Sequence, residues 1–227
     1  CIDSHTHICF GGTRARDYAM RNAGKTYLEI ARAGGGIWDT VLKPRAASRE
    51  ELAGLTSQRA EELLARGITT VEVKSGYGLS VEEELKMLRA IQDASGMTSA
   101  TLVPTCLAAH MVPRDFNGQP DDYLEKIITE LLPVIEEENL CRRIDAFIEE
   151  SAFTSENIRP YFTKAREMGM DITVHADQFH VGGSRVAVDF NAVSADHLEA
   201  SGTAEIELLA GSNTIATALP GASLGLG

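Results

Sequence analysis

Histidine is the residue type that first indicates chemistry in this chain, because five of its six histidines occur in or directly after short apolar segments. His5 and His7 are two residues apart, so on a β-strand, whose side chains repeat every two residues, they point the same way. Two imidazoles at one strand end supply half of a metal site, and the remaining ligands must come from elsewhere. His110, His175 and His197 each end or follow another apolar segment. This pattern predicts a metal-dependent catalytic centre.

The sequence indicates a role for three of these histidines and leaves several roles for a fourth. His5, His7 and His175 give three imidazole nitrogens and leave a position for water, as catalytic zinc sites require. His197 is compatible with a fourth ligand, a helix cap, or a group that polarises the scissile carbonyl, and we favour the last. Cys9 shares the strand face of the histidine pair and is a further candidate ligand, although a small buried hydrophobe is the commoner role for such a cysteine.

The elements that must position these residues alternate between apolar β-rich segments and helical patterns, which is typical of βα units around a parallel sheet. We expect strands at 1–8, 68–74, 100–109, 144–149, 171–176, 191–196 and 213–218, and helices near 48–66, 80–95, 120–138, 154–168 and 203–210. Ser48 and Ser80 each precede a glutamate by three residues and open capping boxes, and Thr154 is a plainer helix start. Gly67 and Gly169 follow helices, where the chain must turn into the next strand.

The number of strands favours an α/β fold of the (β/α)8 barrel type. Such a barrel has eight strands in about 250 residues, so we expect one strand to be missing at the C-terminal side. A doubly wound sheet is the alternative, because strand order cannot be read from the sequence. The chain opens at Cys1 as if inside a strand and stops at Gly227, so we expect an internal piece of a longer protein, with one incomplete catalytic barrel domain over 1–227.

The charge of the chain excludes several classes of partner. Its 33 acidic and 21 basic residues give a net charge of −12, and no basic stripe offsets the repulsion that phosphates would meet. We therefore expect no nucleic-acid partner and no membrane partner, and no apolar run approaches the ~20 residues that span a bilayer. Its 4 scattered cysteines lack the density of a disulfide scaffold, which predicts a cytoplasmic protein.

Several short motifs occur in order along the chain: His5-Thr6-His7 with Phe10-Gly11-Gly12-Thr13-Arg14, Ala33-Gly34-Gly35-Gly36-Ile37, Val73-Lys74-Ser75-Gly76-Tyr77-Gly78-Leu79, His175-Ala176-Asp177-Gln178 and Ser194-Ala195-Asp196-His197. Together they resemble the imidazolonepropionase family, amidohydrolases of histidine degradation. The resemblance implies a metal-dependent amidohydrolase barrel with a small β-sandwich domain and one zinc or iron ion. It also implies a hydrolase that opens the lactam ring of 4-imidazolone-5-propanoate to give N-formimidoyl-L-glutamate.

The resemblance also assigns residues. It makes His5, His7 and His175 metal ligands, and Arg14, Tyr77, His110 and Gln178 contacts of a small-molecule substrate. Our own preference for His197 as the group that polarises the carbonyl makes it the catalytic residue in this interpretation. A guanidinium can hold a propionate carboxylate with two hydrogen bonds. The family's aspartate ligand and its small β domain would lie beyond Gly227, so the chain alone is expected to lack a complete site. Members of the family often form dimers, which makes a homodimer a candidate assembly.

Two other functions remain as alternatives. Another mononuclear amidohydrolase, such as a deaminase of a cyclic amidine or a nucleobase, would share the histidines, but Arg14 with Tyr77 favours a substrate that carries a carboxylate. A non-catalytic barrel used as a binding or assembly module is the alternative from a different class, and the intact histidines argue against it. Binuclear relatives bridge two metals with a lysine at strand three or four, and no lysine ends those segments here, so one metal is favoured.

Overall fold

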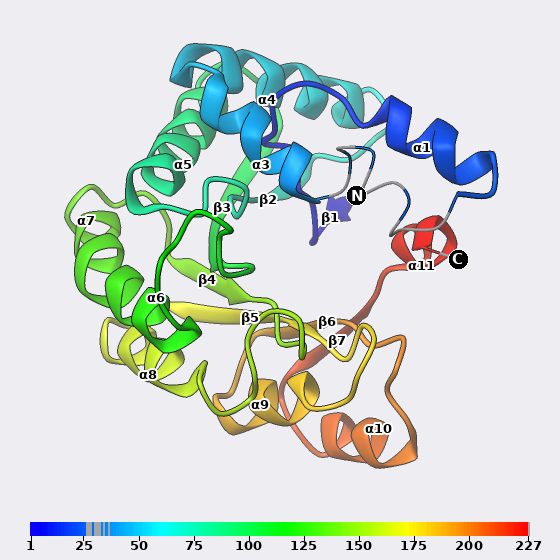
Figure 1. Cartoon of the computed structure of the whole chain (residues 1–227), viewed down its shortest axis with the longest axis vertical. Helices are drawn as coiled ribbons and strands as arrows, with labels where there is room; N and C mark the ends of the chain where they lie inside the picture. The colour runs from blue at the N-terminus through cyan, green and yellow to red at the C-terminus, as the bar shows by residue number, and fades with distance from the viewer. Residues whose placement is uncertain (26–28, 30–32, 34, 36, 227) are drawn as a thin grey trace. The chain divides into compact units, whose positions relative to one another are not determined.

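The computed structural model describes residues 1–25, 29, 33, 35 and 37–226, so Gly34 and Gly36 of the glycine-rich motif lie outside the described residues (Figure 1). The chain divides into two compact units, Cys1–Gly78 with Glu82–Pro104 and Leu79–Val81 with Thr105–Gly227. The strands are hydrogen-bonded in the order β1-β2-β3-β4-β5-β6-β7, which is their order in the chain. A doubly wound sheet reverses its strand order at a switch point, so this sequential order favours the barrel type.

The described part of the first unit contains, in chain order, β1 (Ile2–Asp3), α1 (Ala15–Asn22), α3 (Ile37–Ala46), α4 (Arg49–Leu64) and β2 (Thr70–Lys74). Most of α5 (Val81–Ser95) and the beginning of β3 (Thr101–Ala109) also belong to it. β1 pairs in parallel with β2 and is much shorter than the predicted strand over 1–8. Beyond it the chain still follows β2, because the Thr6 hydroxyl donates to the Glu72 carbonyl and Lys74 N–H donates to the Thr6 carbonyl.

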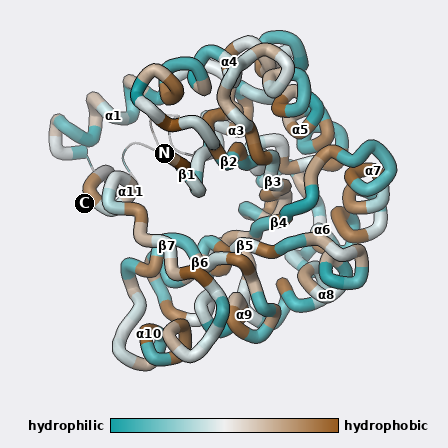
Figure 2. Tube along the Cα trace, turned by 180° about the vertical axis from the view of Figure 1, so that it is seen from behind, coloured by the Kyte–Doolittle hydropathy of each residue, from teal (hydrophilic) through white to brown (hydrophobic). Residues whose placement is uncertain are grey.

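Helices α1 and α3 were not expected from the sequence. The segment of α1 is mostly polar and lacks the apolar period that identifies a helix, whereas α3 carries Pro44 inside the helix, and an internal proline argues against a helix. Helices α4 and α5 agree with prediction: the Ser48 hydroxyl accepts a hydrogen bond from Glu51 N–H and caps α4. Along α5 hydrophobic and hydrophilic segments alternate (Figure 2), and Leu88 and Ile91 are fully buried.

The second unit continues β3 and adds α6 (Pro120–Lys126), the π-helix η1 (Ile127–Leu131), α7 (Leu132–Glu137), β4 (Arg143–Ala146), α8 (Arg159–Glu167), β5 (Asp171–Ala176), α9 (Gly183–Asp189), β6 (Ser194–His197), α10 (Thr203–Ala210), β7 (Ile215–Ala218) and α11 (Pro220–Leu226). The strands β3 to β7 pair in parallel with their neighbours. Helices α9 and α11 were not expected.

Two predicted helices of this unit differ from the structure. The helix expected over 120–138 is interrupted by η1, because Pro133 has no N–H to donate within an α-helix. The helix expected from Thr154 begins only at Arg159, since Thr154 and Asn157 exchange hydrogen bonds in a turn of their own. Pro160 then occupies the first turn of α8, where its missing N–H costs nothing.

Strand β5 joins the core of the second unit to its polar residues. Ile172, Val174 and Ala176 are fully buried on one side of the strand, and α8 and α9 pack against β5 (Figure 1). His175 lies on the opposite side by the two-residue period of the strand. Gly67 and Gly169 have positive φ values of 88° and 70°, as expected for glycines that end a helix before a strand. None of the described helices is long and apolar enough to cross a membrane.

Candidate functional site

In the first unit His5 and His7 form a close pair directly after β1. Their Nε2 atoms are 3.3 Å apart and their ring centroids 5.3 Å apart. Two imidazoles that bind one tetrahedral ion at 2.0–2.1 Å place their nitrogens about 3.3 Å apart. The pair therefore has the separation of two ligands of one ion, although it lies in the segment that follows a two-residue strand and not within a strand.

The segment that carries this pair is fixed by Arg59 of α4. The Arg59 guanidinium donates to the carbonyls of Ile8 (2.7 Å) and Phe10 (2.6 Å) and stacks 3.5 Å from the centre of the Phe10 ring. Cys9 between them is fully buried, and burial raises the pKa of its thiol to about 12. A thiol that resists ionisation is a poor metal ligand, so Cys9 fits the predicted role of a small buried hydrophobe.

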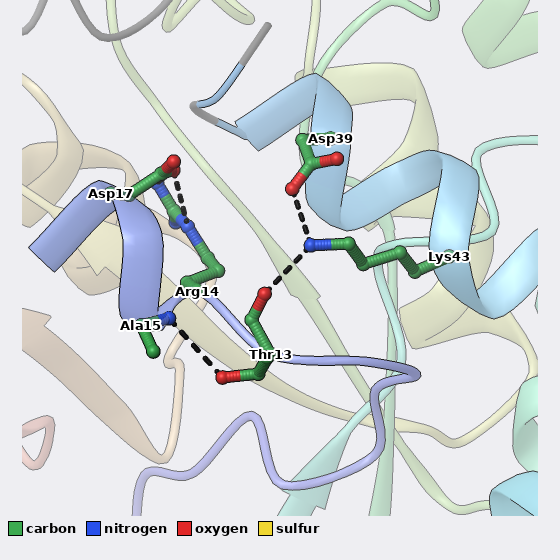
Figure 3. Close-up of polar contacts among 6 residues, drawn as sticks. All are labelled: Thr13, Arg14, Ala15, Asp17, Asp39 and Lys43. Carbon is green, nitrogen blue, oxygen red and sulfur yellow. Dashed lines mark hydrogen bonds and ion pairs between the residues drawn. The ribbon is translucent and has the colours of Figure 1, made fainter.

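Arg14 is held at the start of α1 by an ion pair with Asp17 (Figure 3). Its Nε and Nη2 both lie 3.1 Å from the same oxygen, Oδ2 of Asp17. Two of the five N–H donors of Arg14 are therefore engaged, and the guanidinium is half-exposed. The preceding loop is fixed by Lys43 of α3, which donates to the Thr13 carbonyl at 2.7 Å and pairs with Asp39 (Figure 3).

Tyr77 lies in the loop after β2, beside His7. The Tyr77 and His7 ring centroids are 5.7 Å apart. Burial raises the pKa of the Tyr77 hydroxyl, and the nearby charge of Arg14 opposes this shift. Glu84 of α5 fixes the loop, because its buried carboxylate accepts hydrogen bonds from the N–H groups of Gly76 (2.9 Å) and Gly78 (2.8 Å).

In the second unit three predicted site histidines form a row. The ring centroid of His175, at the end of β5, is 6.0 Å from that of His110, which follows β3, and 5.2 Å from that of His197, which ends β6. All three side chains are buried. The second unit thus brings His110, His175 and His197 together, whereas His5, His7, Arg14 and Tyr77 belong to the first.

His175 has a carboxylate neighbour that sequence reasoning missed. Asp145 of β4 is fully buried, and its Oδ2 lies 2.9 Å from Nδ1 of His175. Its other oxygen, Oδ1, accepts a hydrogen bond from the His175 backbone N–H at 3.2 Å. The signal was present in the sequence, since an acid stands between Ile144 and Ala146 in an apolar strand.

His197 has a strained backbone. Its φ is +86° and that of Leu198 is +69°, and each such residue costs on the order of 1–3 kcal/mol. Asp196 faces His175 in the register of β5 and β6, so regular alternation would turn the His197 ring to the other side. The positive φ breaks this alternation, and the His197 ring lies beside His175. Nδ1 of His197 is 3.4 Å from Oε2 of Glu199.

Gln178 lies in the loop after β5, which hydrogen bonds to the carboxylates of Asp177 and Glu149 hold in place. Asp177 caps α9 by accepting hydrogen bonds from the N–H groups of Gly182 and Ser184. The buried carboxylate of Glu149 accepts from the N–H groups of Phe179 (2.7 Å) and His180 (3.1 Å), and it lies 2.8 Å from Nδ1 of His180. This hydrogen bond raises the pKa of His180. Gln178 between these anchors is half-buried.

A buried ion pair on β2 is a further feature that the sequence did not indicate. Nζ of Lys74 lies 2.7 Å from Oε2 of Glu72, and both side chains are almost fully inaccessible to solvent. The two residues are two positions apart and so share one face of the strand. Glu84, Asp145, Glu149, Glu72 and His180 are thus the polar residues around the predicted site that were missed.

Comparison with known proteins identifies homologous sequences and solved structures with a similar fold. No protein-family model matches the chain. The imidazolonepropionase of Myxococcus xanthus is 46% identical over 224 residues, which are 98% of this chain and 53% of that protein. The imidazolonepropionase of Hahella chejuensis is 43% identical over 222 residues, which are 97% of this chain and 55% of that protein.

Solved structures with similar folds are far more distant in sequence. A 5-methylcytosine deaminase from Klebsiella pneumoniae has a TM-score of 0.70 at 14% identity, covering 99% of this chain and 55% of its own. A variant of atrazine chlorohydrolase from Arthrobacter aurescens has a TM-score of 0.58 at 14% identity, covering 99% and 54%. These likenesses confirm the predicted α/β fold of the amidohydrolase barrel type. The chain spans about half the length of the curated relatives it matches, and over that part it is homologous to the imidazolonepropionases.

Proposed function

We propose that the protein is a metal-dependent hydrolase that opens the lactam ring of 4-imidazolone-5-propanoate to give N-formimidoyl-L-glutamate. Homology to curated imidazolonepropionases over nearly the whole chain carries this proposal. In it, residues 1–227 are part of one catalytic barrel, the protein is cytoplasmic, and a homodimer is its candidate assembly. The alternative of a nucleobase deaminase is supported only by structural neighbours at 14% identity, which show the fold and not the reaction.

The metal part of the proposal assigns His5, His7 and His175 as ligands of one zinc or iron ion. The donor set fits such an ion, because imidazole nitrogens suit both metals and the 3.3 Å separation of the Nε2 atoms of His5 and His7 matches two ligands of a tetrahedral centre. The atrazine chlorohydrolase variant was solved in complex with zinc, which supports a metal in this fold. When bound, such an ion acidifies a water molecule and polarises a carbonyl.

The substrate part assigns the propionate carboxylate to Arg14. Asp17 holds one edge of the guanidinium, which reduces the rotamer freedom that would be lost on binding, and the other edge retains N–H donors for a carboxylate. The Tyr77 hydroxyl stays protonated at neutral pH because burial raises its pKa, so it can donate to a ring nitrogen or carbonyl. His110 and Gln178 complete the proposed contacts.

The catalytic part assigns His197 to the reacting carbonyl. Its strained φ of +86° supports this role, because backbone strain concentrates at functional sites where the fold forces a side chain into position. Glu199, whose carboxylate is 3.4 Å from Nδ1 of His197, would orient the ring, and in the imidazolium form both ring nitrogens carry protons, so that Nε2 can donate to the carbonyl oxygen. A donor aimed at the charge that develops there lowers the barrier to ring opening.

Arg14→Met in the protein as its gene encodes it tests the proposal, with Arg16→Met on exposed α1 as the matched control. Losing a charge-assisted contact to a partly desolvated carboxylate costs roughly 2–5 kcal/mol, or about 30- to several-thousand-fold in kcat/KM. The loss should nearly vanish on an imidazolone without the propionate arm, and Arg16→Met should match the wild type on both compounds. No turnover by the wild type would refute the function, and equal losses on both compounds would refute the role of Arg14.

A further inference from the structure

Asp145 makes two contacts with one residue, His175. Oδ1 accepts the hydrogen bond of the His175 backbone N–H, and Oδ2 lies 2.9 Å from Nδ1 of the same residue. Asp145 lies on β4 and His175 on β5, and the backbone hydrogen bonds between these neighbouring parallel strands set their register. The carboxylate and the imidazole are therefore held against each other by the sheet itself.

We propose that Asp145 is a positioning residue that keeps the ring proton of His175 on Nδ1 and so directs Nε2 to the metal ion, a role that rests on the proposed function. A neutral imidazole carries one proton, and the nitrogen that faces an acceptor keeps it. The other nitrogen then has the lone pair that a metal requires. A carboxylate behind a ligating histidine fixes both the tautomer and the orientation of the ring, and it raises the basicity of the ligand.

The backbone contact places the carboxylate of Asp145 next to the His175 ring. The His175 N–H can only donate, so Oδ1 of Asp145 must accept, and this bond holds the carboxylate beside the imidazole of the same residue. Oδ2 then lies 2.9 Å from Nδ1. The opposite arrangement, a protonated Asp145 that donates to Nδ1, would place the ring proton on Nε2 and block that nitrogen as a ligand.

Aromatic neighbours hold the ring in this orientation. The Phe147 ring meets the His175 ring nearly edge-on, at 6.0 Å between centroids and an angle of 74°. His110 and His197 lie at 6.0 and 5.2 Å from the same ring. Reversing the ring would move a carbon against the buried carboxylate and leave a charged group without this partner, which is costly in a protein interior. Asp145 thus selects one nitrogen of His175.

The tautomer is measured on the metal-free protein by nitrogen-15 NMR of its labelled histidines at pH 9, with His175→Gln to identify the signal. We expect the proton of His175 on Nδ1 in the wild type, and Asp145→Asn should lose this preference because its amide can donate to Nδ1. Ile144→Ala is the matched control, since it opens a cavity on the opposite face of β4 and keeps the carboxylate. A proton on Nε2 in the wild type would overturn the inference.

Metal affinity supplies a second readout, measured with Zn²⁺ by competition with a chelator. Asp145→Asn should raise the Kd for Zn²⁺ by about 10–100-fold, whereas Ile144→Ala should leave the Kd unchanged even if the fold is less stable. Equal affinities of wild type and Asp145→Asn would overturn the inference and leave the proposed function intact. Absence of Zn²⁺ binding by the wild type would instead overturn the proposed metal site, and the tautomer would still decide the role of Asp145.

Discussion

Gly183→Ala tests whether α9 packs as closely on the end of β5 as the structure indicates. An added Cβ at Gly183 would lie 2.6 Å from Cα and 2.9 Å from Cβ of Ala176, and 3.2 Å from the backbone N of Asp177. These atoms belong to the strand end that carries His175, so relief requires the backbone to move.

The expected cost follows from these distances. Overpacking costs about 1–3 kcal/mol, and the upper end applies because most of the contacted atoms are backbone. Gly183 is the first residue of α9, where the helix-interior preference of alanine over glycine contributes little, so we expect a net loss of stability of about 2–3 kcal/mol. Gly54→Ala in α4 is the control, because nothing lies within 4 Å of its added Cβ. That variant should gain about 0.5–1 kcal/mol.

Urea unfolding measures both variants against the wild type, and nitrogen-15 NMR of His175 reports whether the strand end has moved. We expect opposite signs for the two changes in the free energy of unfolding and a shifted His175 signal only in Gly183→Ala. If Gly183→Ala is as stable as the wild type and the His175 signal is unchanged, the close packing of α9 on β5 is wrong.

Two further predictions concern the histidines of the second unit. His197→Ala should retain the metal while kcat falls by about 10²-fold or more, because His197 is assigned to the carbonyl, and a metal-free variant would make it a ligand. Because the hydrogen bond to Glu149 raises the pKa of His180 above its ordinary 6.5, this contact stabilises the fold fully below pH 6.5, and its contribution is lost as pH rises through the raised value. Urea unfolding at pH 6 and pH 9 should therefore show a smaller decline in Glu149→Gln than in the wild type or in the exposed control Glu136→Gln, and an equal decline in all three would contradict this linkage.

The sequence predicted the strands and the histidine pair because both depend on local patterns. A strand forms within or overlapping each of the seven expected segments, and β2 to β6 are short apolar segments that the fold largely buries. The two-residue spacing of His5 and His7 predicted a common direction, and their Nε2 atoms are indeed 3.3 Å apart, although β1 ends at Asp3. Beyond the end of β1, hydrogen bonds from Thr6 to β2 and from Arg59 to the following loop hold the chain extended. They take the place of the backbone bonds that a longer strand would make.

The sequence could not predict features that tertiary contacts impose. The direction of the His197 ring depends on a positive φ that nothing in an apolar strand pattern indicates, because leucine and histidine rarely adopt it. Asp145 was visible as an acid in a strand, but its partner is thirty positions away and is chosen by the pairing of β4 with β5. Glu84 and Glu149 likewise act on loops whose approach is set by the fold.

The metal content of single and double histidine variants tests most directly the claim that His5 and His175 serve one ion. Elemental analysis of the protein as its gene encodes it, after extensive dialysis, should give about one zinc or iron per chain in the wild type. His5→Ala and His175→Ala should each lose most of it, because an ion that loses one of few ligands becomes labile. The double variant should lose no more than the single variants. Undiminished metal in either single variant, or losses that add in the double variant, would contradict the account.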